Sequence, residues 1–170
     1  MNADGRYLGG WDAEPPQGAV EVPSAPADAR QTWLGDQWSE IPSPPVTSAD
    51  IDAERNRRIS AGFSFQGKFY QSRLPSGAHP GDWEVFSGKA LEALIAVMGG
   101  ALKGDLRWSD PDEDFAWIAA DNSRVPMDAH TVIELGKAAL AHRSRCTFAG
   151  SDLKAKSPLP NDYMDDKWWL

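Results

Sequence analysis

The order of hydrophobic and polar residues predicts a folded region that begins near residue 47. Residues 47–62 open with a Thr-x-x-Asp capping pattern and place acidic residues before basic ones, which favours a helix that ends at Gly62. Residues 63–70 then alternate between apolar and polar side chains on both sides of Gln66 and Gly67. This pattern predicts a β-hairpin with its turn at the glycine.

A second helix is predicted from about Asp82 to Met98, followed by Gly99 and Gly100 as a stop signal. Apolar side chains recur within it at positions i, i+3, i+4 and i+7, and they therefore share one face of the helix. These side chains are Leu91, Leu94, Ile95 and Met98. The pattern is typical of an amphipathic helix.

Short strands are predicted at residues 106–108 and 115–120, because both stretches combine aromatic and aliphatic side chains with turn residues at their ends. The second strand turns at residues 121–123 and returns through residues 124–126. Pro126 lacks an amide hydrogen, so it is expected at the edge of a sheet or at the end of a strand.

A third helix is predicted to begin after Asp128, a residue type that often caps helices. Met127 before the cap and Val132 after it have the spacing of a hydrophobic staple. The helix is expected to continue towards Phe148, with Leu153 in a last turn.

These elements predict an α+β fold. About three helices and two β-hairpins, or a short antiparallel sheet, form one small body over residues 47–156. Residues 1–46 contain more than half of the prolines, which restrict the backbone to extended conformations. We therefore expect an extended, proline-rich docking arm in front of the body. Its last stretch, residues 41–45, is expected to be polyproline-like, which suits a spacer.

Aromatic side chains stand between the prolines of this arm and at the end of the chain, where a disordered segment would normally lack them. The residues around Gly35 are compatible with a small hairpin. Residues 157–170 are expected to form an extended aromatic tail that packs on the body or on a partner. The candidates for docking to a partner are Tyr7, Trp11, Trp33, Trp38, Trp168 and Trp169.

Composition narrows the range of functions. The chain has 17 basic and 25 acidic residues and a formal charge of −8, which repels phosphate backbones and anionic lipid surfaces. It has neither an apolar run of about 18 residues nor a signal peptide at its start. We therefore expect no nucleic-acid partner, no membrane insertion, and synthesis in the cytoplasm. Cys146 is the only cysteine, which excludes an intrachain disulfide and a cysteine-based metal cluster within one chain.

Few side chains are candidates for catalysis or metal binding. His79, His130 and His142 do not form the i, i+4 pair of a zinc-hydrolase motif. His142 and Cys146 do have the i, i+4 spacing, and the arginines beside the cysteine would lower the pKa of its thiol. No oxyanion site accompanies this pair, so Cys146 is expected to be a small core residue.

The acidic run Asp110–Asp114 has clustered carboxylates that suit calcium, but the rest of an EF-hand loop is missing, so a solvated loop is expected. Asp114 and Asp121 are the remaining enzyme alternative, a polysaccharide-degrading pair, although nothing in the sequence fixes their separation. The basic cluster Arg55–Arg58 is expected to pair with the preceding acids or with an acidic surface of a partner. The sequence therefore assigns no catalytic residue, no cofactor and no metal ligand, and it predicts that the protein is not an enzyme.

Several short blocks of the sequence recur in the same order in a known family. The blocks are residues 51–55, 58–67, 104–108, 115–122, 125–129 and 135–138. Over residues 50 to 156 the chain resembles a domain of unknown function at the C-terminal end of small tail and tail-fibre assembly proteins of tailed bacteriophages. The turn from Trp33 to Trp38 is similar to a segment in the N-terminal parts of tail-fibre assembly proteins.

The resemblance implies a structural component of a bacteriophage tail, associated with the tail tip or the tail fibre. Such a protein would anchor to other phage tail proteins, would be homo-oligomeric in the assembly, with threefold symmetry as one form, and would contribute to host attachment. Its location would be the tail of the virion, after synthesis in the bacterial cytoplasm. The alternative is a tail-fibre assembly chaperone that is absent from the mature virion. The family supplies no catalytic residue.

Overall fold

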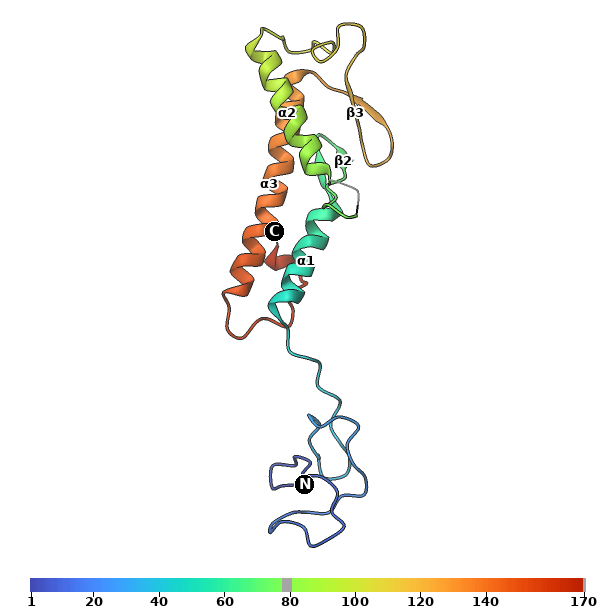
Figure 1. Ribbon diagram of the computed structural model, residues 1–170, viewed down its shortest axis with the longest axis vertical. Helices are drawn as coiled ribbons and strands as arrows, with labels where there is room; N and C mark the ends of the chain where they lie inside the picture. Colours follow the sequence, from blue (N-terminus) through green and yellow to red (C-terminus); the bar gives the residue numbers. More distant parts are fainter. Residues whose placement is uncertain (78–80, 170) are drawn as a thin grey trace. The chain divides into compact units, whose positions relative to one another are not determined.

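The computed structural model describes residues 1–77 and 81–169, and the chain divides into two compact units, Met1–Pro45 and Val46–Leu170 (Figure 1). Among the described residues, the second unit contains three α-helices and two antiparallel two-stranded sheets, which confirms the predicted α+β body. In chain order its elements are α1 (Ser48–Ala61), β1 (Phe63–Phe65), β2 (Lys68–Tyr70), α2 (Asp82–Met98), β3 (Ala116–Ile118), β4 (Arg124–Pro126), α3 (Ala129–Lys154) and the 3-10 helix η1 (Asp166–Trp168).

Helix α1 begins at a capping box, as its sequence predicts. The Asp50 backbone amide donates to the Thr47 hydroxyl (3.3 Å), and the Asp50 carboxylate accepts from the Thr47 backbone amide (2.8 Å). The helix ends at Gly62, whose φ of 93° lies in the left-handed region. An added Cβ there would collide with the carbonyl oxygen of Tyr70, so the close approach of β2 requires glycine.

The β1–β2 hairpin forms at the predicted place, with Phe63 opposite Tyr70. Gln66 and Gly67 both have positive φ, 46° and 76°, as in the type I′ turns that favour two-residue hairpins. Phe63 and Tyr70 are buried in the core that the hairpin forms with α2 and α3. Side-chain burial therefore stabilises this hairpin, since a short isolated ladder is marginal in water.

Helix α3 is the longest element, and both other helices pack along it (Figure 1). It begins at Asp128, whose carboxylate accepts a hydrogen bond from the Thr131 amide (2.7 Å), as predicted. It continues beyond Phe148 to Lys154. Helix α2 lies beside its first half, and α1 lies beside its second half, where Lys154 pairs with Asp52 (2.7 Å).

Helix α2 has the predicted bounds, but its predicted apolar face does not pack on α3. The side chains that α2 buries are Phe86 and Ala93. Ala90 approaches α3 so closely that a Cβ on Gly136 would lie 2.7 Å from the Ala90 Cβ. Small residues thus bring the two helices together. The predicted stripe lies on the exposed side of the helix and consists of Leu91, Leu94, Ile95 and Met98.

The β3–β4 hairpin turns at Asn122, which has a φ of 64°, and Pro126 ends β4, both as predicted. Strand β3 occupies only the middle of the stretch predicted for it. The strand predicted at residues 106–108 is wrong, because the chain bends there. The Asp105 carboxylate accepts a hydrogen bond from the Arg107 amide (2.9 Å), and such local side-chain bonds compete with strand pairing.

Two apolar clusters hold the second unit together. The larger joins α2 and α3 with both hairpins, and the smaller consists of Ile51, Leu153 and Trp169. Trp169 is 3% exposed, and its indole nitrogen donates to the carbonyl oxygen of Tyr163 (2.7 Å). Residues 157–169 therefore pack on α1 and α3, as expected for the tail, but they fold back and are not extended.

The first unit folds back on itself. The Trp38 indole nitrogen donates to the carbonyl oxygen of Ser24 (2.9 Å). A turn at Gly35 places Trp33 opposite Trp38 in a single β-bridge, where the sequence is compatible with a small hairpin. The predicted arm is thus not uniformly extended, and residues 41–45 at its end have no regular element.

Candidate functional site

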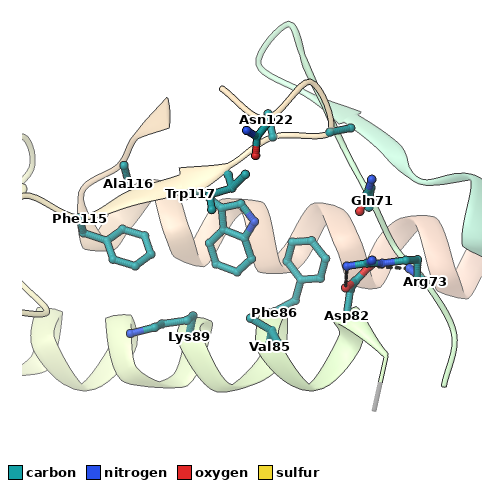
Figure 2. Close-up of a pocket in the computed structure, with 13 residues that line it drawn as sticks. Gln71, Arg73, Asp82, Val85, Phe86, Lys89, Phe115, Ala116, Trp117 and Asn122 are labelled. Carbon is teal, nitrogen blue, oxygen red and sulfur yellow. Dashed lines mark hydrogen bonds and ion pairs between the residues drawn. The ribbon is translucent and has the colours of Figure 1, made fainter. Parts of the chain in front are cut away.

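A groove with a volume of about 450 Å³ lies between α2 and β3 (Figure 2). Its floor is formed by the rings of Phe86 and Trp117, which stack with centroids 4.9 Å apart and an interplanar angle of 8°. Val85 and Ile118 stand at its sides, 52% and 58% exposed. We call this site the β3 groove. Its polar lining consists of Gln71, Arg73, Asp82, Lys89 and Asn122.

The outer edge of β3, which borders the groove, has unpaired backbone groups. The Ala119 amide donates to the Ser123 carbonyl oxygen (2.9 Å), and in an antiparallel pair every second residue bonds to the partner strand. The intervening residues, Ala116 and Ile118, therefore direct their N–H and C=O groups away from β4. Within residues 1–77 and 81–169 these groups have no hydrogen-bond partner. The edge of β3 thus offers donors and acceptors at a two-residue repeat.

The opposite edge of the same hairpin is protected. Pro126 in β4 has no amide hydrogen, and Arg124 places a charged, exposed side chain on the same strand. Proline and charge are the usual means by which proteins prevent the addition of a further strand. Neither is present at Ala116 or Ile118, so β3 is the open edge of the hairpin.

Ion pairs border the β3 groove. The Asp82 carboxylate accepts hydrogen bonds from the guanidinium (3.0 Å) and the backbone amide (2.7 Å) of Arg73, and it raises the pKa of Arg73. Lys89 binds Glu92 (2.7 Å) and lies 5.3 Å from the centre of the Phe115 ring. Because both cations have a carboxylate partner, the groove is close to neutral and suits an uncharged segment of chain.

The outer side of α2 is a second candidate surface. Leu91 is 59% exposed, Leu94 46%, Ile95 63% and Met98 80%. A groove of about 280 Å³ runs beside these side chains, between α2 and α3. We call the four side chains and this groove the α2 face. The groove is lined by Trp83, Ser87, Ala90, Leu91, Leu94, Ile133, Gly136, Lys137 and Leu140.

The predicted docking residues of the first unit have different environments. Tyr7 and Trp33 each make an edge contact with Trp38, with ring centres 6.0 and 5.2 Å apart. These three rings therefore stabilise the first unit itself. Trp11 is 53% exposed and is the one of the four that faces mainly solvent.

The two predicted docking residues at the end of the chain contribute to internal packing. Trp168 is partly buried, and the ammonium group of Lys156 lies 5.0 Å from its ring centre. Trp169 is buried, and the guanidinium of Arg58 lies 5.2 Å from its ring centre. Of the six predicted docking residues, Trp11 alone is mostly exposed.

The His142–Cys146 pair is part of the packing between α1 and α3. His142 Nε2 lies 3.2 Å from the carbonyl oxygens of both Arg58 and Ile59, and its ring stacks on Phe63 with centroids 5.8 Å apart. Cys146 is buried, and burial raises the pKa of its thiol. Cys146 is thus the small core residue that the sequence predicts, and the neighbouring arginines do not lower the pKa of its thiol below its ordinary value.

The carboxylates considered for glycosidase chemistry form surface ion pairs. Asp114 pairs with Arg107 (3.0 Å), and Asp121 accepts hydrogen bonds from Ser123 and from Lys68 (3.0 Å). The bonds from Ser123, followed by that from Lys68, hold the pKa of Asp121 well below its ordinary value. A general acid requires a shift in the opposite direction.

The other chemical candidates are accounted for by local contacts. In the described part of the chain, no group of three or more His, Cys, Asp and Glu side chains could hold a metal ion. The run Asp110–Asp114 has no regular element, His130 lies in the first turn of α3, and His79 lies outside the described residues. The basic cluster pairs with acids as predicted, through the pairs Arg55–Asp52, Arg57–Glu54 and Arg58–Glu54.

Sequence reasoning missed the open edge of β3, and it identified the apolar side of α2 without its exposure to solvent. The open edge of β3 depends on the register of the hairpin, which no local pattern reveals. The α2 face did leave a signal, because the sequence has no charged residue between Glu92 and Lys103. The small residues Ala90 and Ala93 on the same helix were a further signal of close helix packing on another side.

In the part of the chain that the structure describes, none of the helices is both long enough and apolar enough to cross a membrane.

Comparisons with known proteins concern mainly the second unit. A comparison with protein-family models matches residues 44–166 to the Domain of unknown function (DUF4376). Searches of curated proteins and of solved structures gave no match. The matched segment covers most of the sequence, including α1, α2, α3 and both hairpins. The chain therefore belongs to the DUF4376 family.

Proposed function

We propose that this protein is a structural component of a bacteriophage tail, located in the virion at the tail tip or tail fibre. The phage context rests on the resemblance of its short sequence blocks to tail proteins. The observation that carries a structural role is the β3 groove, where an open strand edge lies beside an apolar floor. A site of this kind binds another polypeptide, as a tail subunit must do to stay in place.

The occupant of the β3 groove is an extended segment of a neighbouring tail protein. A polypeptide backbone supplies donors and acceptors at the two-residue spacing of Ala116 and Ile118. Alternate side chains of the added strand would face the stacked rings of Phe86 and Trp117. We therefore expect apolar residues at every second position of the bound segment. We expect no strong charge on it, because the charged side chains at the rim of the groove already neutralise one another in ion pairs.

The first unit supplies a second attachment in this proposal. Trp11 presents an exposed indole, a side chain that is enriched at protein interfaces. The second unit has its own apolar clusters, so removal of residues 1–45 should leave it folded. We expect the truncated chain to fold, as judged by circular dichroism, and to be lost from phage particles. Normal incorporation of the truncated chain would show that the first unit is dispensable for attachment.

Mass spectrometry of purified phage particles tests the proposal directly. The protein should be present at a few copies per particle, estimated against the major tail protein. Its absence from mature particles, together with co-purification of the chain with the tail fibre from infected cells, would instead identify an assembly chaperone. Absence from both would reject a role in the tail.

The β3 groove can be tested with a substitution that leaves the hairpin intact. Ala116→Pro removes an outward-facing N–H group but none of the hydrogen bonds between β3 and β4. Ala116→Ser is the matched control, because it changes the side chain and keeps the N–H group. We expect Ala116→Pro to reduce incorporation into particles and Ala116→Ser to leave it unchanged. Equal incorporation of both folded variants would exclude strand addition at β3.

A further inference from the structure

Three arginines line a pocket at the C-terminal end of α1, where residues of α3 and η1 complete its walls. The pocket has a volume of about 340 Å³ and shares no lining residue with the β3 groove. We call it the arginine pocket. Its charged lining consists of Arg57, Arg58, Arg145 and Asp166. A chain with a formal charge of −8 thus gathers positive charge at one place.

Arg58 is held in place by several contacts. Its Nε donates a hydrogen bond to Glu54 (2.6 Å), its Nη1 to Asp166 (2.8 Å), and its Nη2 to the carbonyl oxygen of Met164 (2.6 Å). Its guanidinium also lies 5.2 Å from the centre of the Trp169 ring. The side chain is 15% exposed. Arg58 therefore forms a fixed wall of the arginine pocket.

Arg57 and Arg145 have hydrogen-bond donors to spare. Arg57 binds Glu54 through Nε (2.6 Å) and Nη2 (2.7 Å), which leaves its Nη1 without a partner among the described residues. Arg145 is exposed, and it has no hydrogen bond or ion pair within residues 1–77 and 81–169. A guanidinium has five N–H groups and no acceptor. The unused donors therefore suit an anion with oxygen acceptors.

The charge balance of the arginine pocket selects an anion with a single negative charge. The three arginines stand against two carboxylates, those of Asp166 and Glu54, which leaves one positive charge in excess. A phosphate dianion would exceed this charge and would lie in a pocket that Asp166 also lines. Charges beyond about 8 Å are largely screened at physiological ionic strength, so distant acidic residues of the chain matter less. A carboxylate therefore matches the pocket.

We propose that the arginine pocket binds the carboxylate of a Glu or Asp side chain on a partner protein. Sites for small molecules enclose most of their ligand. Here Arg57 and Arg145 are exposed, so the partner itself has to cover the ion pair. The charge-assisted hydrogen bonds from these arginines strengthen as the partner excludes water. A second copy of the chain is a poor source of the carboxylate, because two charges of −8 repel each other.

Nuclear magnetic resonance titration of the purified full chain tests the choice of ligand. The probe is a blocked pentapeptide with one glutamate between alanines, and its glutamine counterpart is the neutral control. The glutamate peptide should shift the side-chain N–H signals of Arg145 until they saturate, and the glutamine peptide should not shift them. No response to the glutamate peptide, or binding of inorganic phosphate that is equal or tighter, would overturn the inference.

A pair of variants on α3 tests the site. Arg145→Gln should weaken binding of the glutamate peptide by about tenfold or more, followed by the backbone signals that shift with the wild type, because it removes hydrogen bonds to a charged group. Arg143→Gln is the matched control, since it removes the same charge two positions away. The Arg143 guanidinium lies 5.5 Å from the centre of the Trp83 ring and does not line the pocket. Equal weakening by both variants would overturn the inference.

The terminal carboxylate of the chain is a possible competitor, and a third variant tests it. Three glycines added after Leu170 move this carboxylate along the chain, and binding of the glutamate peptide should stay unchanged. If only the lengthened chain bound the peptide, the pocket would belong to the chain's own terminus, and the inference would be overturned. All these measurements use the purified chain, so this inference and the tail assignment can fail separately.

Discussion

Helices α1 and α2 lie along opposite halves of α3, and they present different chemistry to solvent. The outer side of α1 is polar, since Asp50, Asn56 and Arg57 are exposed there, and Arg57 pairs with Glu54 (2.6 Å). The outer side of α2 is apolar, and Ile95 and Met98 are 63% and 80% exposed there. Water therefore solvates the outer side of α1 favourably, whereas the outer side of α2 gains from being covered.

The inner sides of the two helices explain this difference. Helix α1 turns Ile51 inward, where it is fully buried against Leu153 and Trp169. Helix α2 turns small side chains towards α3, and the close contact there is between Ala90 of α2 and Gly136 of α3. Because small residues bring α2 close to α3, the larger aliphatic side chains of α2 stay on its outer side.

The largest expected effect comes from the buried side of α2. Phe86→Ala should lower the free energy of unfolding by about 3–5 kcal/mol. Phe86 is 3% exposed and stacks on Trp117, so its truncation leaves a cavity between α2 and β3. Val85→Ala, at a residue that is 52% exposed, should change the free energy of unfolding by less than about 0.5 kcal/mol. Urea denaturation followed by circular dichroism measures both, and equal losses would contradict the assignment of buried and exposed sides.

A smaller loss is expected from the ion pairs of α1. The Glu54 side chain is 4% exposed and accepts hydrogen bonds from two arginines. Glu54→Gln keeps the size and removes the charge, and it should lower the free energy of unfolding by about 1–3 kcal/mol. Glu134→Gln is the matched control, because Glu134 forms an exposed pair with Lys137 that should contribute less than about 0.5 kcal/mol. Equal losses in the two variants would show that burial of Glu54 adds nothing.

Glu54 should also make stability depend on pH. The hydrogen bond from Arg57 is the main cause that holds the pKa of Glu54 below its ordinary value of 4.5, and Arg58 adds to it while burial opposes it. A carboxyl group with a lowered pKa in the folded state stabilises that state fully above the ordinary value. The contribution is lost as the pH falls below 4.5 and through the folded-state pKa. Below this pH the wild type should lose stability more steeply than Glu54→Gln, and parallel curves would contradict the assignment.

Local signals were sufficient to predict most elements of the second unit. The caps at Thr47 and Asp128 and the turn at Gln66 and Gly67 lie where the sequence places them, because each depends on a few neighbouring residues. The strand predicted at residues 106–108 failed for the same kind of reason, since a local side-chain bond bends the chain.

Features that depend on distant residues could not be predicted in this way. The spacing of Leu91, Leu94, Ile95 and Met98 identified a real apolar face but not which side of the helix meets α3. That choice is made by Gly136, which is far away in the sequence. The burial of Trp169 and the open edge of β3 likewise depend on tertiary contacts and strand register. The open edge of β3 and the outward orientation of the apolar side of α2 therefore became visible only in the folded chain.

Two glycines distinguish close helix packing from solvent exposure. Gly136→Ala would place a Cβ 2.7 Å from the Ala90 Cβ, and it should lower the free energy of unfolding by about 1 kcal/mol or more. A Cβ added at Gly88 on α2 would meet nothing within 4 Å, so Gly88→Ala should raise the free energy of unfolding by about 0.5–1 kcal/mol. The midpoint temperature of thermal unfolding should therefore fall for Gly136→Ala and rise for Gly88→Ala. A shift in the same direction would mean that α2 and α3 are not in close contact at Gly136.

The smallest effect is expected on the outer side of α2. Ile95 and Ile59 are the same residue type on the two helices, but Ile95 is 63% exposed and Ile59 is 4% exposed. Ile95→Gln should change the free energy of unfolding by less than about 0.5 kcal/mol. Ile59→Gln should lower it by about 2–5 kcal/mol, because it replaces a packed aliphatic side chain with an amide that is buried without a designed partner. If Ile95→Gln destabilised the chain as much as Ile59→Gln does, the outer side of α2 would belong to the core, and the contrast with α1 would not exist.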